Sequence, residues 1–311
     1  MTQPALCKSW RPLTRGMVVD VVAPSGRDCD PDTVERVKAL LESWQLIPRV
    51  SPDLFGEHLL CANTDENRFK QLREALLNPE SSAVWCLRGG YGCTRLMPAL
   101  IKLKVPKISK LFIGFSDITT LHLFLQQKWH WQTLHGPSAS QVAHQRIHAD
   151  NIQELKKVVF GKLKQLVFSL SPLNDVANHT KRITSSLIGG NLTLVQASLA
   201  TPWQIETKGK ILFLEEVNET AYRVDRMLQH LQQAGILRQV QAIVFGDFIS
   251  EKKSNDEALM QAVLKHFAKA QHVPILQCTG VGHGEANRSL PLATSAEIKF
   301  SKKQLTVKIT N

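Results

Sequence analysis

The stretch Leu111-Phe112-Ile113-Gly114-Phe115-Ser116-Asp117 joins a short apolar run to a segment, Ile118 to Gln126, in which apolar residues recur at helical spacing. This pattern predicts a strand, a tight turn and a helix. A serine on such a turn lies exposed at the carboxyl edge of a sheet, as the nucleophile of many hydrolases does. Because Ile118 stands where that turn usually has glycine, an ordinary strand-to-helix junction with a serine N-cap is the alternative.

The rest of the first half also alternates apolar runs with helical patterns. Strands are expected at 17–23 and 83–87, with a helix at 66–77 between them. Such alternation is typical of parallel strands linked by crossover helices. We therefore predict an α/β fold with a Rossmann-like parallel N-terminal sheet, helices on both of its faces, and the serine turn at its edge.

The second half mixes strand and helix patterns. Apolar runs at 211–214 and 241–245 predict strands, and 222–234 has the spacing of an amphipathic helix. Between the halves the periodicity weakens and polar residues dominate. We predict an N-terminal α/β nucleophile domain at 1–150, a connection at 151–182, and a smaller mixed α/β domain at 183–311.

Composition limits the function classes. The 311 residues are 43% hydrophobic and 21% charged, and six scattered cysteines form no Cys-x-x-Cys pair, so we expect reduced thiols and no metal site. No segment approaches the run of about 20 consecutive apolar residues that a membrane helix needs, and no secretory signal is evident. We expect a cytoplasmic protein without a membrane partner. The net charge of +11 is spread along the chain without a nucleic-acid-binding motif, so no nucleic-acid partner is expected.

A serine nucleophile needs a base and an acid that orients the base. His283 is the best candidate base, because glycines flank it and leave the ring unobstructed; a tight surface turn is the alternative. Glu215 is the best candidate acid, because it ends an apolar strand and would be partly desolvated at a sheet edge. The neighbouring Glu216 and Glu219 are expected to point elsewhere or to be solvated.

The glycine-rich run Arg88-Gly89-Gly90-Tyr91-Gly92 also follows a predicted strand. It lacks the Lys-Ser/Thr of a P-loop and the spacing of a dinucleotide-binding loop. We interpret it as a loop whose backbone N–H groups serve an oxyanion, with nucleotide binding as the alternative.

Taken together, these segments resemble the L,D-carboxypeptidases that trim murein peptides, a superfamily that also includes the microcin C resistance peptidases. The resemblance covers about residues 17 to 295 and rests on seven motifs in order: Ala23-Pro24-Ser25-Gly26, Arg88-Gly89-Gly90-Tyr91-Gly92, Gly114-Phe115-Ser116-Asp117, His135-Gly136-Pro137, Gly189-Gly190-Asn191, Leu214-Glu215-Glu216 through Arg223-Val224-Asp225-Arg226-Met227-Leu228, and Gly282-His283.

The resemblance implies a catalytic triad of Ser116 as nucleophile, His283 as base and then acid, and Glu215 as the residue that orients it. It further implies that the backbone N–H groups of Gly90 and Asp117 form the oxyanion hole. The family's serine lies on the N-terminal domain and its glutamate and histidine on the C-terminal domain. No metal or organic cofactor is implied, and a homodimer is expected.

Three further residues are expected to contact substrate. Arg88 would offer a bidentate cation to a terminal carboxylate, although a structural carboxylate is an alternative partner. Tyr91 and Asn191 are expected to contact the peptide.

The predicted function is a cytoplasmic serine L,D-carboxypeptidase that releases the terminal D-alanine from murein tetrapeptides. The alternatives are a detoxifying serine peptidase acting on peptidyl or aminoacyl nucleotides, a non-catalytic peptide-binding protein on the same fold, and a nucleotide-binding α/β protein. Two positions depart from the resemblance, because Ala200 and Ala293 stand where the family pattern has glycine. Both are expected to affect loop geometry and to leave the triad in place.

Overall fold

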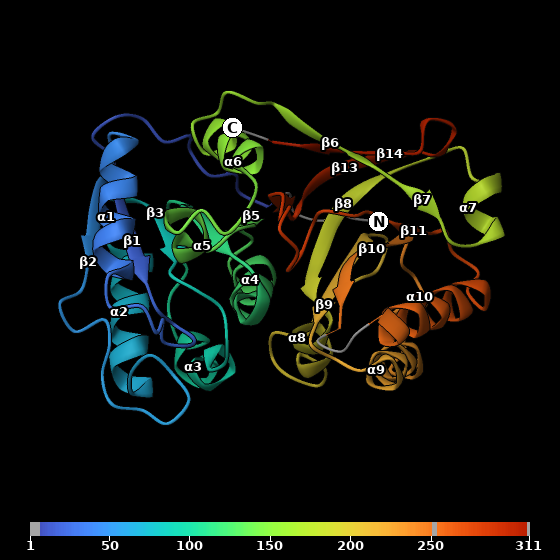
Figure 1. Cartoon of the computed structure of the whole chain (residues 1–311), viewed down its shortest axis with the longest axis horizontal. Helices are drawn as coiled ribbons and strands as arrows, with labels where there is room; N and C mark the ends of the chain where they lie inside the picture. The colour runs from blue at the N-terminus through green and yellow to red at the C-terminus, as the bar shows by residue number, and fades with distance from the viewer. Residues whose placement is uncertain (1–6, 251–253, 310–311) are drawn as a thin grey trace.

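Two β-sheets organise the chain, and the computed structural model describes residues 7–250 and 254–309 (Figure 1). The first sheet has the strand order β12-β5-β4-β3-β1-β2. Its strands are β1 (Val18–Val22), β2 (Ile47–Val50), β3 (Ser81–Cys86), β4 (Leu111–Gly114), β5 (Thr133–His135) and β12 (Leu290–Leu292). Neighbours from β2 to β5 pair in parallel, and β12 alone joins this sheet in the antiparallel sense.

Helices cover both faces of the first sheet, as the sequence predicted. The apolar residues of α1, α5 and α6 pack into one core cluster, and those of α2, α3 and α4 pack into another on the opposite face. These helices are α1 (Thr33–Ser43), α2 (Asp65–Leu77), α3 (Cys93–Leu100), α4 (Thr119–Lys128), α5 (Ala139–Ala143) and α6 (Ala149–Val159). The predicted Rossmann-like arrangement is therefore confirmed.

Local sequence explains where α2 begins. In α2 the hydroxyl of Thr64 accepts a hydrogen bond of 3.3 Å from the backbone N–H of Asn67, and two acidic residues occupy the first turn, where the helix dipole favours them. Leu72 and Leu76 lie four residues apart and are both buried. The capped end and the apolar stripe together fix this crossover helix against the sheet.

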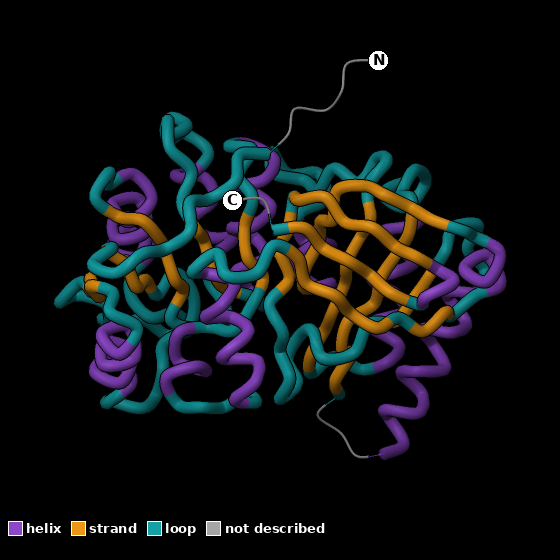
Figure 2. Tube along the Cα trace, turned by 90° about the horizontal axis from the view of Figure 1, so that it is seen from above, coloured by secondary structure: helices purple, strands orange, loops and turns teal. Residues whose placement is uncertain are grey.

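The second sheet has the order β6-β14-β13-β8-β9-β10-β11-β7 and spreads across the right-hand side of the molecule in Figure 2. Its strands are β6 (Gln165–Ser169), β7 (Ser171–Pro172), β8 (Arg182–Asn191), β9 (Ile211–Val217), β10 (Ala242–Ile249), β11 (Ile275–Gln277), β13 (Thr294–Lys299) and β14 (Gln304–Lys308). The centre is parallel and both edges are antiparallel. The remaining helices are α7 (Asp175–His179), α8 (Leu192–Ala197), α9 (Ala221–Gln233) and α10 (Ser254–Lys269), with 3-10 turns at Ser116–Ile118 and Phe300–Lys302.

The segment 151–182, which the sequence predicts as a connection, contains regular secondary structure. It contains most of α6, and its strands β6 and β7 form the two opposite edges of the second sheet. The weak periodicity has a physical reason: in β6 only Leu166 and Phe168 point into the core, and polar or exposed residues separate them. The second sheet thus draws on chain from 165 onward, and the predicted domain limits remain predictions.

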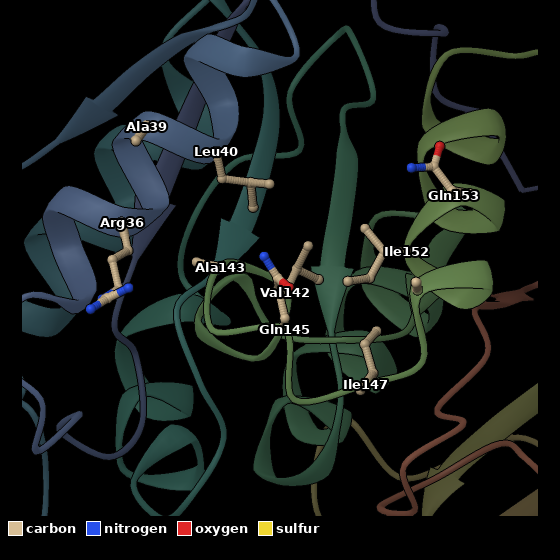
Figure 3. Close-up of a pocket in the computed structure, with 10 residues that line it drawn as sticks. Arg36, Ala39, Leu40, Val142, Ala143, Gln145, Ile147, Ile152 and Gln153 are labelled. Atoms are coloured by element: carbon tan, nitrogen blue, oxygen red, sulfur yellow. The ribbon is translucent and has the colours of Figure 1, made fainter.

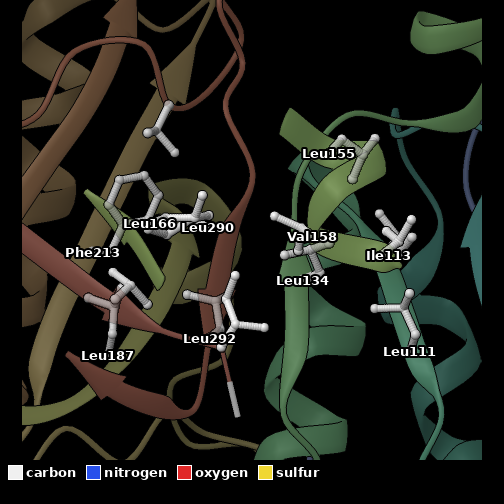
Figure 4. Packing of buried hydrophobic residues seen from close by; sticks show 14 of the residues in the cluster. Leu111, Ile113, Leu134, Leu155, Val158, Leu166, Leu187, Phe213, Leu290 and Leu292 are labelled. Atoms are coloured by element: carbon white, nitrogen blue, oxygen red, sulfur yellow. The ribbon is translucent and has the colours of Figure 1, made fainter. Parts of the chain in front are cut away.

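One apolar core spans both sheets. Leu134 of β5, Leu187 of β8 and Leu292 of β12 belong to the same buried cluster, and Figure 4 shows side chains of this cluster on strands of both halves. The chain passes from β12 in the first sheet to β13 in the second through the single residue Ala293. The two halves therefore share packing as well as a peptide connection.

Both alanines that depart from the family pattern have left-handed backbone angles. The φ angle is +58° at Ala200 and +58° at Ala293. A Cβ atom is strained there by about 1–2 kcal/mol, whereas glycine is not. This explains why glycine suits these positions and why alanine leaves local strain in this chain.

We predict that Ala200→Gly and Ala293→Gly each stabilise the protein. Relief of the left-handed strain exceeds the about 0.4–1 kcal/mol that glycine costs through unfolded-state entropy, so a net gain of about 0.5–1 kcal/mol is expected. Denaturant unfolding measures it. Ala39→Gly, inside α1, is the control and should lose about 0.5–1 kcal/mol. Destabilisation by both test variants would contradict the strain argument.

Candidate active site

Ser116 lies on a sharp turn between β4 and α4. Phe115 is extended, with φ −157° and ψ −177°, and Ser116 then turns to φ +66° before the 3-10 turn that leads into α4. A non-glycine residue in this left-handed region is uncommon and is the backbone geometry of a nucleophile elbow. The serine is partly exposed, whereas Phe115 is buried. The elbow predicted from the sequence is therefore present, although Ile118 replaces the usual glycine.

The glycine-rich loop packs directly against this elbow. A Cβ atom on Gly89 would lie 2.8 Å from the Cβ atom and 3.1 Å from the Oγ atom of Ser116, so only glycine allows this approach. The backbone N–H of the next residue, Gly90, has no acceptor among the described residues. Arg88, on the other side, donates from Nη1 to the carbonyl oxygen of Arg27 at 2.5 Å, and Tyr91 is 47% exposed. Loop and serine thus meet at one place.

The side chain of Asp117 ties three loops together beneath the elbow. It is 2% exposed and accepts hydrogen bonds from Ser25 Oγ at 2.6 Å and from the Cys93 backbone N–H at 2.9 Å. Burial raises the pKa of this carboxyl, while the two hydrogen bonds oppose the rise. The family resemblance implied a role only for the backbone N–H of Asp117. That N–H lies in the first turn of the 3-10 helix, where backbone N–H groups have no carbonyl partner within the helix.

A buried histidine supports the strand that ends at the elbow. His122 of α4 donates from Nε2 to the carbonyl oxygen of Gly114 at 2.8 Å. Burial lowers the pKa of His122 to about 4, so its ring is neutral at pH 7 and keeps one N–H for this bond. This contact fixes the end of β4 from the helix that follows it.

Glu215, on the second sheet, pairs with His283, which lies in the loop between β11 and β12. Glu215 is fully buried on β9, and its Oε2 lies 2.7 Å from Nδ1 of His283. Burial of the imidazole disfavours its charged form, but the negative charge of Glu215 and its hydrogen bond outweigh this, so the pKa of His283 is raised above the ordinary 6.5. The hydrogen bond at Nδ1 leaves Nε2 as the atom available to a third group.

The pair faces the elbow of the first sheet. The rings of His283 and Phe115, the residue before Ser116, have centroids 4.7 Å apart and planes at 50°. No hydrogen bond joins Ser116 to His283 in the part of the chain that the structure describes. Catalytic hydrogen bonds are often long without substrate and shorten in the complex. Residues 115 and 283 are therefore in contact, which brings the three triad candidates into one region.

Glu216 has a structural role beside the pair. Its carboxylate accepts hydrogen bonds from Asn191 Nδ2 at 2.9 Å and from the N–H and hydroxyl of Thr193 at 2.8 and 2.7 Å. Burial raises its pKa. Asn191 is itself buried and caps α8 through its Oδ1 atom, 3.3 Å from the N–H of Leu194. A capping role accounts for Asn191, and its expected contact with substrate remains a prediction.

Asp247, near the end of β10, holds the loop that carries His283. Its Oδ1 accepts a hydrogen bond of 3.0 Å from the N–H of Gly280, and its own N–H donates to the carbonyl oxygen of Val281 at 2.9 Å. Burial raises the pKa of Asp247, and its charge contributes to the raised pKa of His283. No sequence expectation covered this residue, although Asp247, like Glu215, follows an apolar run that predicts a strand.

Other candidate sites lie away from these residues. A cavity of about 650 Å³ between α1, α5 and α6 is lined by Leu40, Val142 and Ile152 among others, and includes none of the site residues predicted from sequence (Figure 3). Within residues 7–250 and 254–309 no cluster of three or more His, Cys, Asp or Glu side chains could hold a metal ion. No helix in the same residues is long and apolar enough to cross a membrane.

Comparison with known protein families gives two matches, one in each half of the chain. Residues 19–136 match the LD-carboxypeptidase N-terminal domain, and residues 184–298 match the LD-carboxypeptidase C-terminal domain. The first match contains Ser116 and the second contains Glu215 and His283.

Individual relatives cover most of the chain. A putative carboxypeptidase from Rickettsia conorii is 44% identical over 79% of this chain and 77% of its own, and the murein tetrapeptide carboxypeptidase of Pseudomonas aeruginosa is 29% identical over 97% and 98%. The crystal structure of muramoyltetrapeptide carboxypeptidase from Oxalobacter formigenes superposes with a TM-score of 0.79 at 28% identity, covering 94% of this chain and 99% of that one. An MccF-like protein from Bacillus anthracis has the same fold, with a TM-score of 0.81 at 21% identity over 97% and 99%.

We predict that Asp247→Asn lowers the pKa of His283. The amide keeps an acceptor for the N–H of Gly280 but removes a negative charge that stabilises the imidazolium, so the His283 ring loses its proton at lower pH. The other ionisable groups that act on the His283 ring, Glu215, Glu216 and the buried His135, are unchanged. NMR titration of the imidazole measures the shift. Asp150→Asn, on the exposed start of α6, is the matched control and should leave the His283 titration unchanged. An unchanged titration in Asp247→Asn would contradict the role of this charge.

Proposed function

Because the chain belongs to the LD-carboxypeptidase family, we propose that it is a serine peptidase whose triad is Ser116, His283 and Glu215. The substrate proposed is a murein tetrapeptide, and the product is its terminal D-alanine. The names of the Pseudomonas and Oxalobacter proteins support this substrate. Cytoplasmic recycling of cell-wall peptides and a homodimeric state are part of the same proposal.

One observation carries the proposal. The 2.7 Å hydrogen bond between His283 and the fully buried Glu215 of the second sheet faces the strained turn at Ser116 on the first sheet. A structural histidine would need neither a fully buried carboxylate partner at Nδ1 nor a position against a left-handed serine. A triad needs both, because the carboxylate fixes the tautomer and the ring must reach the nucleophile through Nε2.

In the proposed first step, Ser116 Oγ attacks the carbonyl carbon of the amide between the L-centre of the diamino acid and D-alanine. Nε2 of His283 takes the hydroxyl proton as the C–O bond forms, and Glu215 stabilises the resulting imidazolium. The ring then protonates the leaving amine, the C–N bond breaks and D-alanine departs. Water repeats the sequence on the acyl-enzyme and releases the tripeptide.

The oxyanion that forms in each step needs fixed donors. The N–H of Gly90 is without an acceptor among the described residues and lies in the loop that packs on Ser116, and the N–H of Asp117 begins the following turn. Such preorganised donors stabilise developing charge by a few kcal/mol. The proposal assigns the oxyanion hole to these two groups.

Removal of a terminal residue requires recognition of its carboxylate. Arg88 lies in the same glycine-rich loop, and its Nη1 donates to the carbonyl oxygen of Arg27, which leaves further donors of the guanidinium for a ligand. We assign the terminal carboxylate to Arg88. Tyr91, exposed two residues beyond Gly89, is assigned to the peptide.

The test is D-alanine release from purified murein tetrapeptide. Ser116→Ala, His283→Ala and Glu215→Gln should each lower kcat/KM roughly a thousandfold or more, and the Ser116/His283 double variant should lose no more than either single variant, because triad members act as a unit. Ser43→Ala and His148→Ala, both exposed, are the matched controls and should retain activity. Equal activity of Ser116→Ala and wild type would exclude the serine mechanism.

Substrate choice is tested with a parallel substrate. A folded wild-type protein that cleaves a peptidyl or aminoacyl nucleotide and leaves the tetrapeptide intact would replace the murein assignment and keep the triad. Ligand binding without turnover of either substrate, together with no labelling by a fluorophosphonate, would identify a binding protein on this fold.

The raised pKa of His283 predicts the acidic limb of the pH profile. The ring must be neutral to accept the serine proton, so kcat/KM of the free enzyme should fall as pH decreases through a value above 6.5. Glu215→Gln removes the charge that raises this pKa, and the residual activity should show its acidic limb at lower pH. A limb at the same pH in both proteins would show that another group controls it.

A further inference from the structure

The loop between α3 and β4 has an unusual surface. Its residues 101–110, here called the 101–110 loop, read Ile-Lys-Leu-Lys-Val-Pro-Lys-Ile-Ser-Lys. Three of its aliphatic side chains face solvent: Ile101 is 38% exposed, Val105 50% and Ile108 55%. Lys102, Lys104 and Lys107, which alternate with them, are also exposed. Aliphatic and cationic side chains therefore share one short surface segment.

The loop is held in this arrangement by its other residues. Leu103 packs against the core cluster of α2, α3 and α4. Lys110 is only 5% exposed, and its Nζ donates to the carbonyl oxygens of Ala75 at 2.6 Å and Asn78 at 2.5 Å. A lysine is thus inside while three aliphatic residues lie outside, the reverse of the usual preference. The exposed aliphatic residues are consequently displayed on an anchored loop.

The charged residues of the loop itself are all lysines. The chain has no acidic residue between Glu80 and Asp117, and Asp117 is buried. The three exposed lysines form no ion pair with the described residues. The neighbouring segment adds the exposed Lys8 and Arg11, because Ser109 Oγ donates to the carbonyl oxygen of Ser9 at 2.5 Å. The surface is therefore cationic with aliphatic residues interspersed.

We propose that the 101–110 loop docks the protein peripherally on an anionic lipid bilayer. Lysines near such a surface are attracted to the acidic headgroups, and aliphatic side chains beside them insert at the boundary of headgroups and acyl chains. This proposal departs from the expectation of no membrane partner, which rested on the lack of an apolar segment long enough to span a bilayer. The proposal does not depend on the chemistry assigned to Ser116.

Two other partners fit the loop less well. Single-stranded nucleic acid is bound by aromatic side chains that stack on bases, and the loop between Ile101 and Lys110 contains none. A second copy of the chain across a two-fold axis would bring Lys102, Lys104 and Lys107 near the same lysines of its partner. Like charges oppose that contact, whereas acidic headgroups favour the one proposed.

Vesicle flotation tests the proposal with the whole chain. Wild type should bind vesicles of equal parts phosphatidylcholine and phosphatidylglycerol, bind pure phosphatidylcholine far less, and bind more weakly at high salt. The triple variant Lys102→Gln, Lys104→Gln, Lys107→Gln should partition roughly a hundredfold less, because each lysine near the surface contributes about fivefold. Val105→Ser with Ile108→Ser should also weaken binding, and Val105→Trp should strengthen it through an interfacial aromatic ring.

A matched control separates the effect of the loop's lysines on vesicle binding from the effect of the protein's overall net charge. Lys157→Gln, Lys162→Gln and Lys164→Gln remove three exposed lysines elsewhere and give the same net charge. This variant should bind vesicles nearly as wild type does, and all variants should retain the thermal unfolding temperature. The proposal would be overturned if wild type did not bind the vesicles, or if the two triple variants lost equal amounts of vesicle binding. It would also be overturned if the triple variant of the 101–110 loop bound single-stranded DNA more weakly but bound vesicles as wild type does. Light scattering that showed loss of a dimer in the loop variant, while its vesicle binding stayed intact, would overturn the proposal as well.

Discussion

The pairing of β12 with β5 fixes how the two sheets face each other, and the candidate site depends on that arrangement. Leu290 lies opposite His135, and His135 lies opposite Gly114, so three adjacent strands align the end of β4 with β12. Ser116 follows Gly114 by two residues, and His283 precedes Leu290 by seven. A histidine and a serine that are distant in sequence therefore lie in one region because a short C-terminal strand completes the N-terminal sheet.

A second connection joins the helix after the serine to the strand that carries the acid. The hydroxyl of Thr119 accepts the backbone N–H of Asn191 at 3.0 Å, and the Asn191 amide donates to Glu216, the neighbour of Glu215. The buried carboxylate of Glu216 is thus satisfied by groups that also fix α8 and α4. Burial without these partners would cost several kcal/mol. The polar network therefore ties the helix after Ser116 to the strand that carries Glu215.

The sequence predicted what depends on local pattern. The strand before Ser116, the helix after it, a strand over 211–214 and the parallel first sheet are all present, because periodicity and glycine placement determine them locally. It did not predict that β6 and β7 form the edges of the second sheet, since their pairing partners lie far along the chain. The roles of Asp247 and of the Asp117 carboxylate likewise arise only when distant loops are brought together. The function of the triad came from resemblance, since no local rule pairs Glu215 with His283.

The arrangement of the first sheet also separates the surface proposed to contact lipid from the candidate site. The 101–110 loop leads into the amino end of β4, and Ser116 follows its carboxyl end. A strand of four residues spans about 13 Å, so the two features lie at opposite ends of the same strand. Docking through the loop would therefore place the lipid at the amino edge of the sheet and leave the carboxyl edge, with Ser116 and His283, facing the aqueous phase. Soluble peptides could then reach the site without passing the bilayer, because attachment and catalysis would occupy opposite edges of one sheet.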